Sequence, residues 1–209
     1  MVEAPSPTRL LLATTNAGKL REIRDILGDL PMALVALDDL PPITEPLETG
    51  ATFAENAQLK ARCYAGMTGE LTVAEDSGLE IEALDGEPGV RSARFNGESY
   101  QEKFHTIARL LDERGSSTSK ARFVCAVAVW REDRLIWETT GIVEGSLQLP
   151  PQGSGGFGYD PIFHYPPYGR TLAEVSAAEK AAISHRGQAF RSLRTHLQSR
   201  TSQHHSVSL

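Results

Sequence analysis

The stretch LLLATTNAGKLREIRDIL, residues 10–27, decides how the chain begins to fold. Its first part, Leu10 to Thr15, predicts a short buried strand, because an apolar run gives way to small polar residues. Leu20, Ile23 and Leu27 then recur at the spacing of one helical face, which predicts a helix after the intervening loop. The chain therefore opens as strand, loop and helix.

The remaining pattern predicts a mixed order of strands and helices. Thr52 and Ser99 each stand three residues before a glutamate, and such capping boxes predict helix starts. Strands are expected at 32–37, 71–74, 79–84, 121–131 and 135–148, and helices at 52–65, 100–111, 172–182 and 185–197. This order predicts an α/β or α+β fold with a mixed sheet. Residues 9–197 are expected to form a single domain, with flexible termini at 1–8 and 198–209.

Composition excludes several classes of protein. The 209 residues carry 21 basic and 27 acidic side chains, a formal charge of −6, with no basic run. Binding of nucleic acid through phosphate neutralisation is therefore not expected. No apolar run approaches the ~20 residues that cross a bilayer, so no membrane role is expected. Two cysteines far apart, Cys63 and Cys125, favour a reducing, cytoplasmic setting.

The loop between the first strand and the first helix is a candidate phosphate site. It consists of Thr14, Thr15, Asn16, Ala17, Gly18 and Lys19. A helix N-terminus offers unpaired N–H groups and a positive dipole end, and small residues let an anion approach them. The P-loop motif is absent, because Leu20 follows the lysine. A capped helix with a solvated lysine is the alternative.

Acidic residues at Glu48, Glu75 and Asp76 form a second candidate site. We expect the last two at a turn between strands, where carboxylates can converge on Mg²⁺ and its phosphate ligands. A carboxylate free of the ion could orient or deprotonate water. Acids on a surface turn can also be simply solvated. Lys60 shares a helix face with Asn56, four residues earlier, and as a surface lysine it would have no further role.

Two segments near the C-terminus could hold a planar ligand. The loop GSGGFGYD, residues 153–160, combines four glycines with two aromatic residues and an acid that could bind a ribose hydroxyl or fix the loop. Ser184 is a candidate N-cap, and His185 and Arg186 then place cations in a first helical turn, which opposes the helix dipole unless an anion or acceptor is bound. Lys180 could join them. The alternatives are ordinary packing of Phe157 and an exposed basic helix end.

Five motifs together resemble the inosine triphosphate pyrophosphatase family, the Ham1-like pyrophosphatases of non-standard purine nucleoside triphosphates. They are TTNAGK (14–19), ETGATFAENAQLKA (48–61), EDSGL (75–79), GGFGYDPIF (155–163) and EKAAISHRGQA (179–189). The resemblance implies an elongated mixed β-sheet with flanking helices, two lobes around a central cleft, and a homodimer. Thr15 stands where a glycine is common, and Glu75 where an aspartate is common.

The resemblance also implies roles for residues. Asp76 is similar to the family's general base and, with Glu48, to its Mg²⁺ ligands. The residues implied to bind substrate are Thr14, Thr15, Asn16, Ala17, Gly18, Lys19, Lys60, Ser77, Phe157, Gly158, Tyr159, Asp160, Lys180, His185 and Arg186. The expected activity is Mg²⁺-dependent hydrolysis of ITP, dITP or XTP to the monophosphate and pyrophosphate. A pyrophosphatase for other altered nucleotides and a nucleotide sensor without turnover are the alternatives.

Overall fold

A computed structural model describes residues 8–205 of the chain, with side chains up to residue 199. The expected flexible termini fall in part on residues 1–7 and 206–209, which lie outside this range. The strands are β1 (Arg9–Leu12), β2 (Ala33–Ala36), β3 (Leu71–Ile81), β4 (Lys120–Arg131), β5 (Arg134–Leu147), β6 (Phe163–Tyr165) and β7 (Arg170–Thr171). The α-helices are α1 (Ala17–Leu27), α2 (Phe53–Thr68), α3 (Tyr100–Glu113), α4 (Ala177–Ile183) and α5 (His185–His205).

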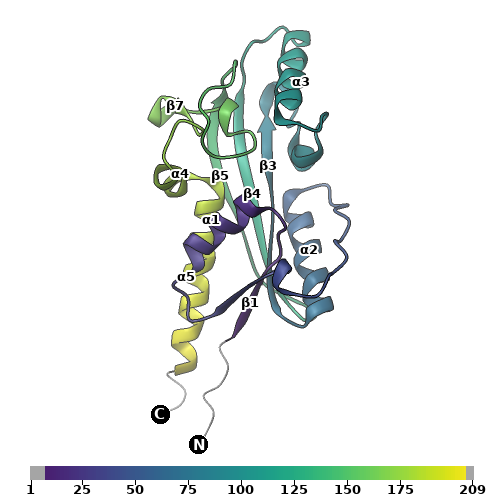
Figure 1. Cartoon of the computed structure of the whole chain (residues 1–209), viewed down its shortest axis with the longest axis vertical. Helices are drawn as coiled ribbons and strands as arrows, with labels where there is room; N and C mark the ends of the chain where they lie inside the picture. The colour runs from purple at the N-terminus through teal and green to yellow at the C-terminus, as the bar shows by residue number, and fades with distance from the viewer. Residues whose placement is uncertain (1–7, 206–209) are drawn as a thin grey trace, which may run out of the picture. The chain divides into compact units, whose positions relative to one another are not determined.

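The seven strands form one mixed sheet in the order β2-β1-β3-β4-β5-β6-β7, which confirms the predicted fold class. β1 pairs in parallel with both β2 and β3, whereas β6 pairs antiparallel with β5 and β7. The neighbours β4 and β5 are joined by the two-residue turn Glu132–Asp133, so they run antiparallel, as predicted. Figure 1 shows β3, β4 and β5 as the long strands of this sheet.

The chain divides into two compact units. The first contains residues 1–76, 126–140 and 189–209, and the second contains residues 77–125 and 141–188. In the first unit the buried apolar residues come from β1, α1, α2 and the start of β3. In the second unit, Phe104, Ile107 and Leu111 of α3 pack into one core with Leu79 and Ile81 of β3. Each unit thus has its own buried apolar residues.

Helix starts follow the predicted caps. The Thr52 and Ser99 hydroxyls accept the N–H groups of Glu55 and Glu102, which confirms both capping boxes. The predicted helix at 172–182 begins too early. The N–H of Leu172 still donates to the carbonyl of Phe163, and α4 starts only after Ser176, whose capping box with Glu179 was not predicted. Helix α5 runs beyond the predicted residue 197 to His205.

The predicted turn at residues 75–78 is wrong, because β3 runs through it without a break. Asp, Ser and Gly favour turns, and that preference produced the prediction. Gly78 serves close packing instead, since a Cβ there would lie 2.2 Å from the Oγ of Ser92. The same Oγ accepts the N–H of Leu79 at 2.9 Å. Glu75 and Asp76 therefore lie inside a strand rather than at its end.

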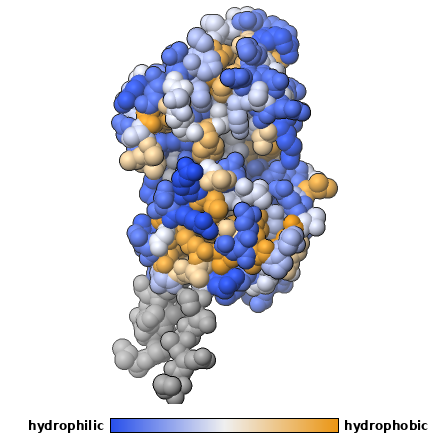
Figure 2. Space-filling view, in the orientation of Figure 1, coloured by the Kyte–Doolittle hydropathy of each residue, from blue (hydrophilic) through white to orange (hydrophobic). Residues whose placement is uncertain are grey.

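Few large hydrophobic side chains are exposed among the described residues. Among the described residues the large hydrophobic side chains exposed are those of Leu47, Met67, Tyr100, Leu135 and Ile142. Figure 2 shows mostly hydrophilic residues over the upper part of the visible face and more hydrophobic residues gathered in its lower part. Of the helices in the described part, none has both the length and the apolar character needed to cross a membrane.

Candidate functional site

The loop before α1 forms a capped helix start in the first unit. Asn16 is the N-cap, and its Oδ1 accepts the N–H of Lys19 at 3.0 Å. The Thr14 hydroxyl accepts the N–H of Asn16, whereas Thr15, Asn16 and Ala17 are exposed. The side chain of Lys19 is not simply solvated, because its ammonium lies 3.0 Å from Oε1 of the buried Glu75. The helix start thus combines exposed small residues with a fixed cation.

A second group of predicted residues meets beside this loop, on α2 and β3. Lys60 of α2 is only 8% exposed, so the interpretation as a surface lysine is wrong. Its Nζ lies 2.5 Å from Oε1 of Glu48 and 3.4 Å from Oδ1 of Asp76. We call Glu48, Lys60 and Asp76 the carboxylate cluster. One ammonium group thus links two acids that lie 28 residues apart in the sequence.

Burial and charge set the protonation behaviour of this cluster. Burial raises the pKa of Asp76, and the neighbouring Glu48 raises it further, while Lys60 and Asn56 act in the opposite direction. For Lys60, burial acts to lower the pKa, but the carboxylates of Asp76, Glu48 and Glu75 outweigh it and the pKa lies above its usual value. Lys60 therefore stays charged, and Asp76 is a stronger base than an ordinary aspartate.

The donor set fits Mg²⁺ in the way this ion usually binds. Among the described residues, no three His, Cys, Asp or Glu side chains converge as a metal cage. Mg²⁺ is commonly held by one or two carboxylates together with substrate phosphates and water. Glu48 and Asp76 supply two carboxylates that already approach one shared cation, the Lys60 ammonium. These residues therefore suit an ion that arrives with a nucleotide.

In the second unit, Phe157, Asp160, Lys180 and Arg186 form what we call the aromatic–cation cluster. Oδ2 of Asp160 accepts the N–H of Phe157 at 2.8 Å and lies 2.6 Å from Nζ of Lys180. That ammonium lies 4.3 Å from the centre of the Phe157 ring, and the Arg186 guanidinium lies 5.6 Å from it. Asp160 thus fixes both the loop and the lysine, and two cations lie next to one partly exposed ring.

The start of α5 is buried rather than an exposed basic helix end. The Ser184 hydroxyl accepts the N–H of Gly187, which confirms Ser184 as the N-cap. Arg186 is 2% exposed and donates to the Ser77 hydroxyl at 2.9 Å. His185 is also buried, and its ring stacks on Phe123 at 4.8 Å between centroids. Phe123 was not predicted, because a valine- and alanine-rich strand gives no signal beyond ordinary core packing.

Tyr159 is the buried aromatic residue of the glycine-rich loop. Its ring is buried in an edge contact with Tyr100 at 5.2 Å, and its hydroxyl donates to the carbonyl of Ser92 at 2.9 Å. Burial raises the pKa of this hydroxyl. Gly158, the preceding residue, has a φ of 69°, which favours glycine. Between the two aromatic residues of the loop, Phe157 is therefore the one with surface left for a ligand.

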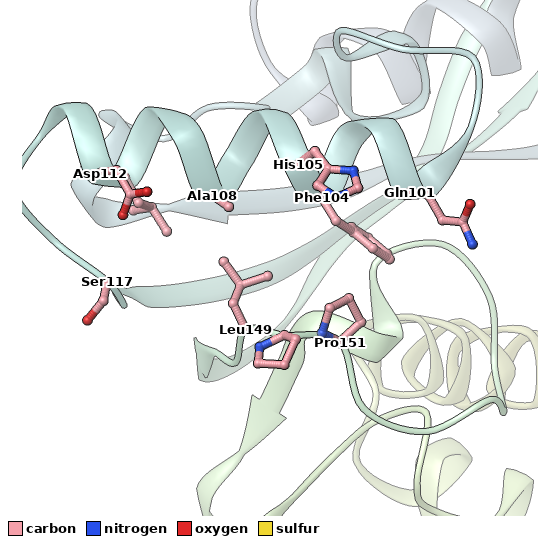
Figure 3. Close-up of a pocket in the computed structure, with 10 residues that line it drawn as sticks. Gln101, Phe104, His105, Ala108, Asp112, Ser117, Leu149 and Pro151 are labelled. Atoms are coloured by element: carbon pink, nitrogen blue, oxygen red, sulfur yellow. The ribbon is translucent and has the colours of Figure 1, made fainter.

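An apolar pocket of about 460 Å³ lies elsewhere in the second unit, between α3 and residues 149–151. Figure 3 shows Phe104, His105 and Ala108 of α3 facing Leu149 and Pro151 across it. Its described lining contains no lysine or arginine and none of the predicted site residues. This pocket is a poor candidate for binding a triphosphate.

Known proteins with similar sequences cover nearly all of the chain. The chain is 44% identical over 193 residues to a dITP/XTP pyrophosphatase of Geobacter sulfurreducens, covering 91% of this chain and 96% of that protein. It is 47% identical over 194 residues to a dITP/XTP pyrophosphatase of Streptomyces coelicolor, covering 89% and 95%.

Solved structures agree with these sequence relatives. A HAM1 protein from Coxiella burnetii matches with a TM-score of 0.84 and 39% identity, over 92% of this chain and 99% of that one. The Ham1 protein of Staphylococcus aureus matches with a TM-score of 0.83 and 34% identity, over 92% and 100%. The model of the Ham1 family matches residues 10–196. The chain therefore belongs to the Ham1 family.

Proposed function

We propose that this protein hydrolyses dITP, ITP and XTP to the nucleoside monophosphate and pyrophosphate, and so removes altered purine nucleotides from the nucleotide pool. The observation that carries the proposal is the carboxylate cluster, in which a buried aspartate of raised pKa shares one ammonium group with a second acid. The names of the relatives from Geobacter and Streptomyces support dITP and XTP as substrates.

The chemistry assigned to the first unit is attack of water on the α-phosphorus. Asp76 accepts a proton from the water as its oxygen bonds to phosphorus, and the bond from phosphorus to the bridging oxygen of the leaving pyrophosphate breaks. Lys19 and Lys60 stabilise the negative charge that develops on the pyrophosphate. Glu48 and Asp76 would hold Mg²⁺, which would supply further positive charge beside the leaving pyrophosphate. Thr14 to Gly18 contribute the exposed helix start to the phosphates.

The aromatic–cation cluster is assigned to the base and sugar. Phe157 offers a ring for stacking, while Lys180, His185 and Arg186 are donors suited to the 6-keto oxygen of hypoxanthine or xanthine. Adenine carries a 6-amino group, which leaves such a donor without an acceptor, and polar mismatches of this kind can reach about 10⁴-fold in kcat/KM. Selection for the 6-keto group follows from this chemistry.

The test is pyrophosphate release from ITP, dITP, XTP, GTP, ATP and dTTP, each with and without Mg²⁺. We expect release from ITP, dITP and XTP that requires the ion and is far slower from ATP. Asp76→Asn should abolish release while the circular dichroism spectrum is retained. Equal turnover of ATP and ITP would reject the assigned selectivity, and preferred turnover of dTTP would favour a pyrophosphatase that acts on other nucleotides. Nucleotide binding with no release from any substrate would identify a sensor.

We also propose that the protein is a cytoplasmic homodimer. Two free cysteines, Cys63 and the buried Cys125, are compatible with a reducing compartment. Light scattering of the purified chain measures the mass directly. A monomer mass near 22.7 kDa at micromolar concentration would reject the dimer.

A further inference from the structure

Asn56 is a buried polar residue of α2 whose side chain joins two segments of the first unit. It is 1% exposed. Its Nδ2 donates to Oδ2 of Asp76 at 3.1 Å, and its Oδ1 accepts the backbone N–H of Gly50 at 2.8 Å. Gly50 follows Glu48 by two residues. The amide therefore connects the strand that carries Asp76 with the segment that carries Glu48.

The chemistry of the partners fixes the direction of this amide. A backbone N–H can only donate, so the oxygen of Asn56 must face Gly50. An ionised carboxylate can only accept, so the NH₂ group must face Asp76. Rotating the amide by 180° would replace both hydrogen bonds with repulsive contacts. An asparagine satisfies both partners here, whereas an aspartate of the same shape satisfies only one.

The two carboxylate oxygens of Asp76 have different partners on α2. Oδ2 accepts from Asn56, and Oδ1 faces the Lys60 ammonium at 3.4 Å. Asn56 and Lys60 are four residues apart on α2, so consecutive turns of one helix hold the two ends of the carboxylate. The fit at Gly50 is close, because a Cβ there would lie 2.7 Å from Oδ1 of Asn56.

We propose that Asn56 is a positioning residue for hydrolysis, which sets the direction of the Asp76 carboxylate and holds the segment of Glu48 against α2. This inference rests on the proposed function, since the direction of Asp76 affects turnover only if Asp76 activates water. Misplacing a catalytic group by about 1 Å can slow the chemical step about 10²-fold. The expected defect is therefore in kcat.

The experiment compares the wild-type chain, Asn56→Ala and Asn56→Asp, with Gln58→Ala as the control. Gln58 lies on the same helix and donates to Glu138, outside the proposed machinery. Both Asn56 variants should lower kcat for dITP about 10²-fold, with KM within about threefold of wild type. Asn56→Asp keeps an acceptor for Gly50 but places a carboxylate oxygen opposite Asp76, so its kcat should be no higher than that of Asn56→Ala. Gln58→Ala should match the wild type.

Binding without turnover provides a second measurement. The probe is a dITP analogue in which a methylene group replaces the oxygen between the α- and β-phosphorus. Its Kd should be the same for the wild type and both Asn56 variants within about threefold, because Asn56 is not assigned to bind the nucleotide. A large rise in Kd with unchanged kcat would show that Asn56 binds substrate, and it would overturn the positioning role.

The remaining outcomes distinguish failure of the role of Asn56 from failure of the proposed hydrolase activity. A wild-type chain that releases no pyrophosphate would overturn both. An active wild type with equally active Asn56 variants would overturn only the role of Asn56. Asn56→Asp changes almost no volume, so loss of its folded circular dichroism spectrum would assign Asn56 to stability alone and would also overturn the inference.

Discussion

The ammonium group of Lys19 lies 3.0 Å from Oε1 of Glu75, and this contact joins the first turn of α1 to β3. A cation in a first helical turn opposes the helix dipole. Glu75, buried inside β3, offsets that effect and restricts the position of the lysine. The contact gives Glu75 a role in orienting a cation that the proposed mechanism places on the pyrophosphate.

Glu75→Gln should therefore lower kcat/KM for dITP about tenfold, mainly through kcat, because the Lys19 ammonium would no longer be preorganised. Steady-state kinetics with dITP measure the effect. Glu80→Gln is the matched control, since Glu80 lies on β3 like Glu75 and its ion pair, with Arg122 of β4, is more exposed. An unchanged kcat in Glu75→Gln would contradict the orienting role, and a higher kcat would show that Glu75 competes with the substrate for Lys19.

A buried ion pair makes Asp160 important for stability as well as for the base site. Asp160 and Lys180 lie 2.6 Å apart with side chains 3% and 7% exposed. Asp160→Asn removes the negative charge that lies 2.6 Å from a buried ammonium, which should lower the free energy of unfolding by about 3 kcal/mol. Urea denaturation followed by circular dichroism measures this change.

The matched control for Asp160 is Asp85→Asn, which breaks an exposed pair with Arg114. Exposed pairs contribute about 0–1 kcal/mol, so this variant should unfold close to the wild-type midpoint. Similar losses in the two variants would contradict the assignment of a buried, stabilising pair to Asp160. A smaller loss of stability in Asp160→Asn than in Asp85→Asn would contradict it as well.

Two glycines should respond to alanine with opposite signs. A Cβ at Gly78 would lie 2.2 Å from Oγ of Ser92 and 2.8 Å from the carbonyl oxygen of Gly89, so Gly78→Ala should lower stability by about 1–3 kcal/mol. Apart from its chain neighbours and the backbone of α2, no heavy atom of the described residues lies within 4 Å of a Cβ at Gly66. Gly66→Ala should raise stability by about 0.5–1 kcal/mol, because alanine is the better helix former. Urea denaturation measures both changes in stability, as shifts of the midpoint with an unchanged slope. A Gly78→Ala variant as stable as the wild type would contradict the close packing of Gly78 against Ser92.

Gly78 shows the limit of what local sequence patterns can predict about the fold. Caps at Thr52, Ser99 and Ser184 were predictable, because the partners of a cap lie within three residues. The run Asp76-Ser77-Gly78 has the composition of a turn, but it continues as a strand because Ser92 packs against it. Ser92 lies 14 residues beyond Gly78, and no local sequence pattern predicts that the two residues are in contact.

In the candidate site, too, some features could be predicted from the sequence and others depend on long-range contacts. The five motifs identified the residue types and the family, but the pairing of Lys19 with Glu75 and of Asn56 with Asp76 depends on contacts 56 and 20 residues apart. Periodicity placed Asn56 and Lys60 on one face of a helix. It could not show that this face is buried against β3, since both side chains are polar and polar faces usually lie in solvent.

The capping box of α3 provides a pH-dependent prediction. Oε2 of Glu102 accepts the N–H groups of Ser99 and Glu98 at 2.9 and 2.8 Å. These hydrogen bonds hold the pKa of Glu102 below its ordinary value of 4.5. A carboxylate with a lowered pKa stabilises the fold above its pKa in the unfolded chain, and this stabilisation is lost as the pH falls through the lower, folded-state pKa.

Glu102→Gln removes the charge but leaves an acceptor oxygen, so it isolates the charge-assisted part of these hydrogen bonds. At pH 7 we expect a lower Tm than that of the wild type, and the difference should shrink as the pH falls below the ordinary range of glutamate. Glu113→Gln at the other end of α3 is the control, because Glu113 forms an exposed pair with Arg109. Thermal unfolding at a series of pH values measures both variants. A Tm difference for Glu102→Gln that stays constant down to pH values at which carboxyl groups are protonated would show that the charge of Glu102 does not stabilise α3.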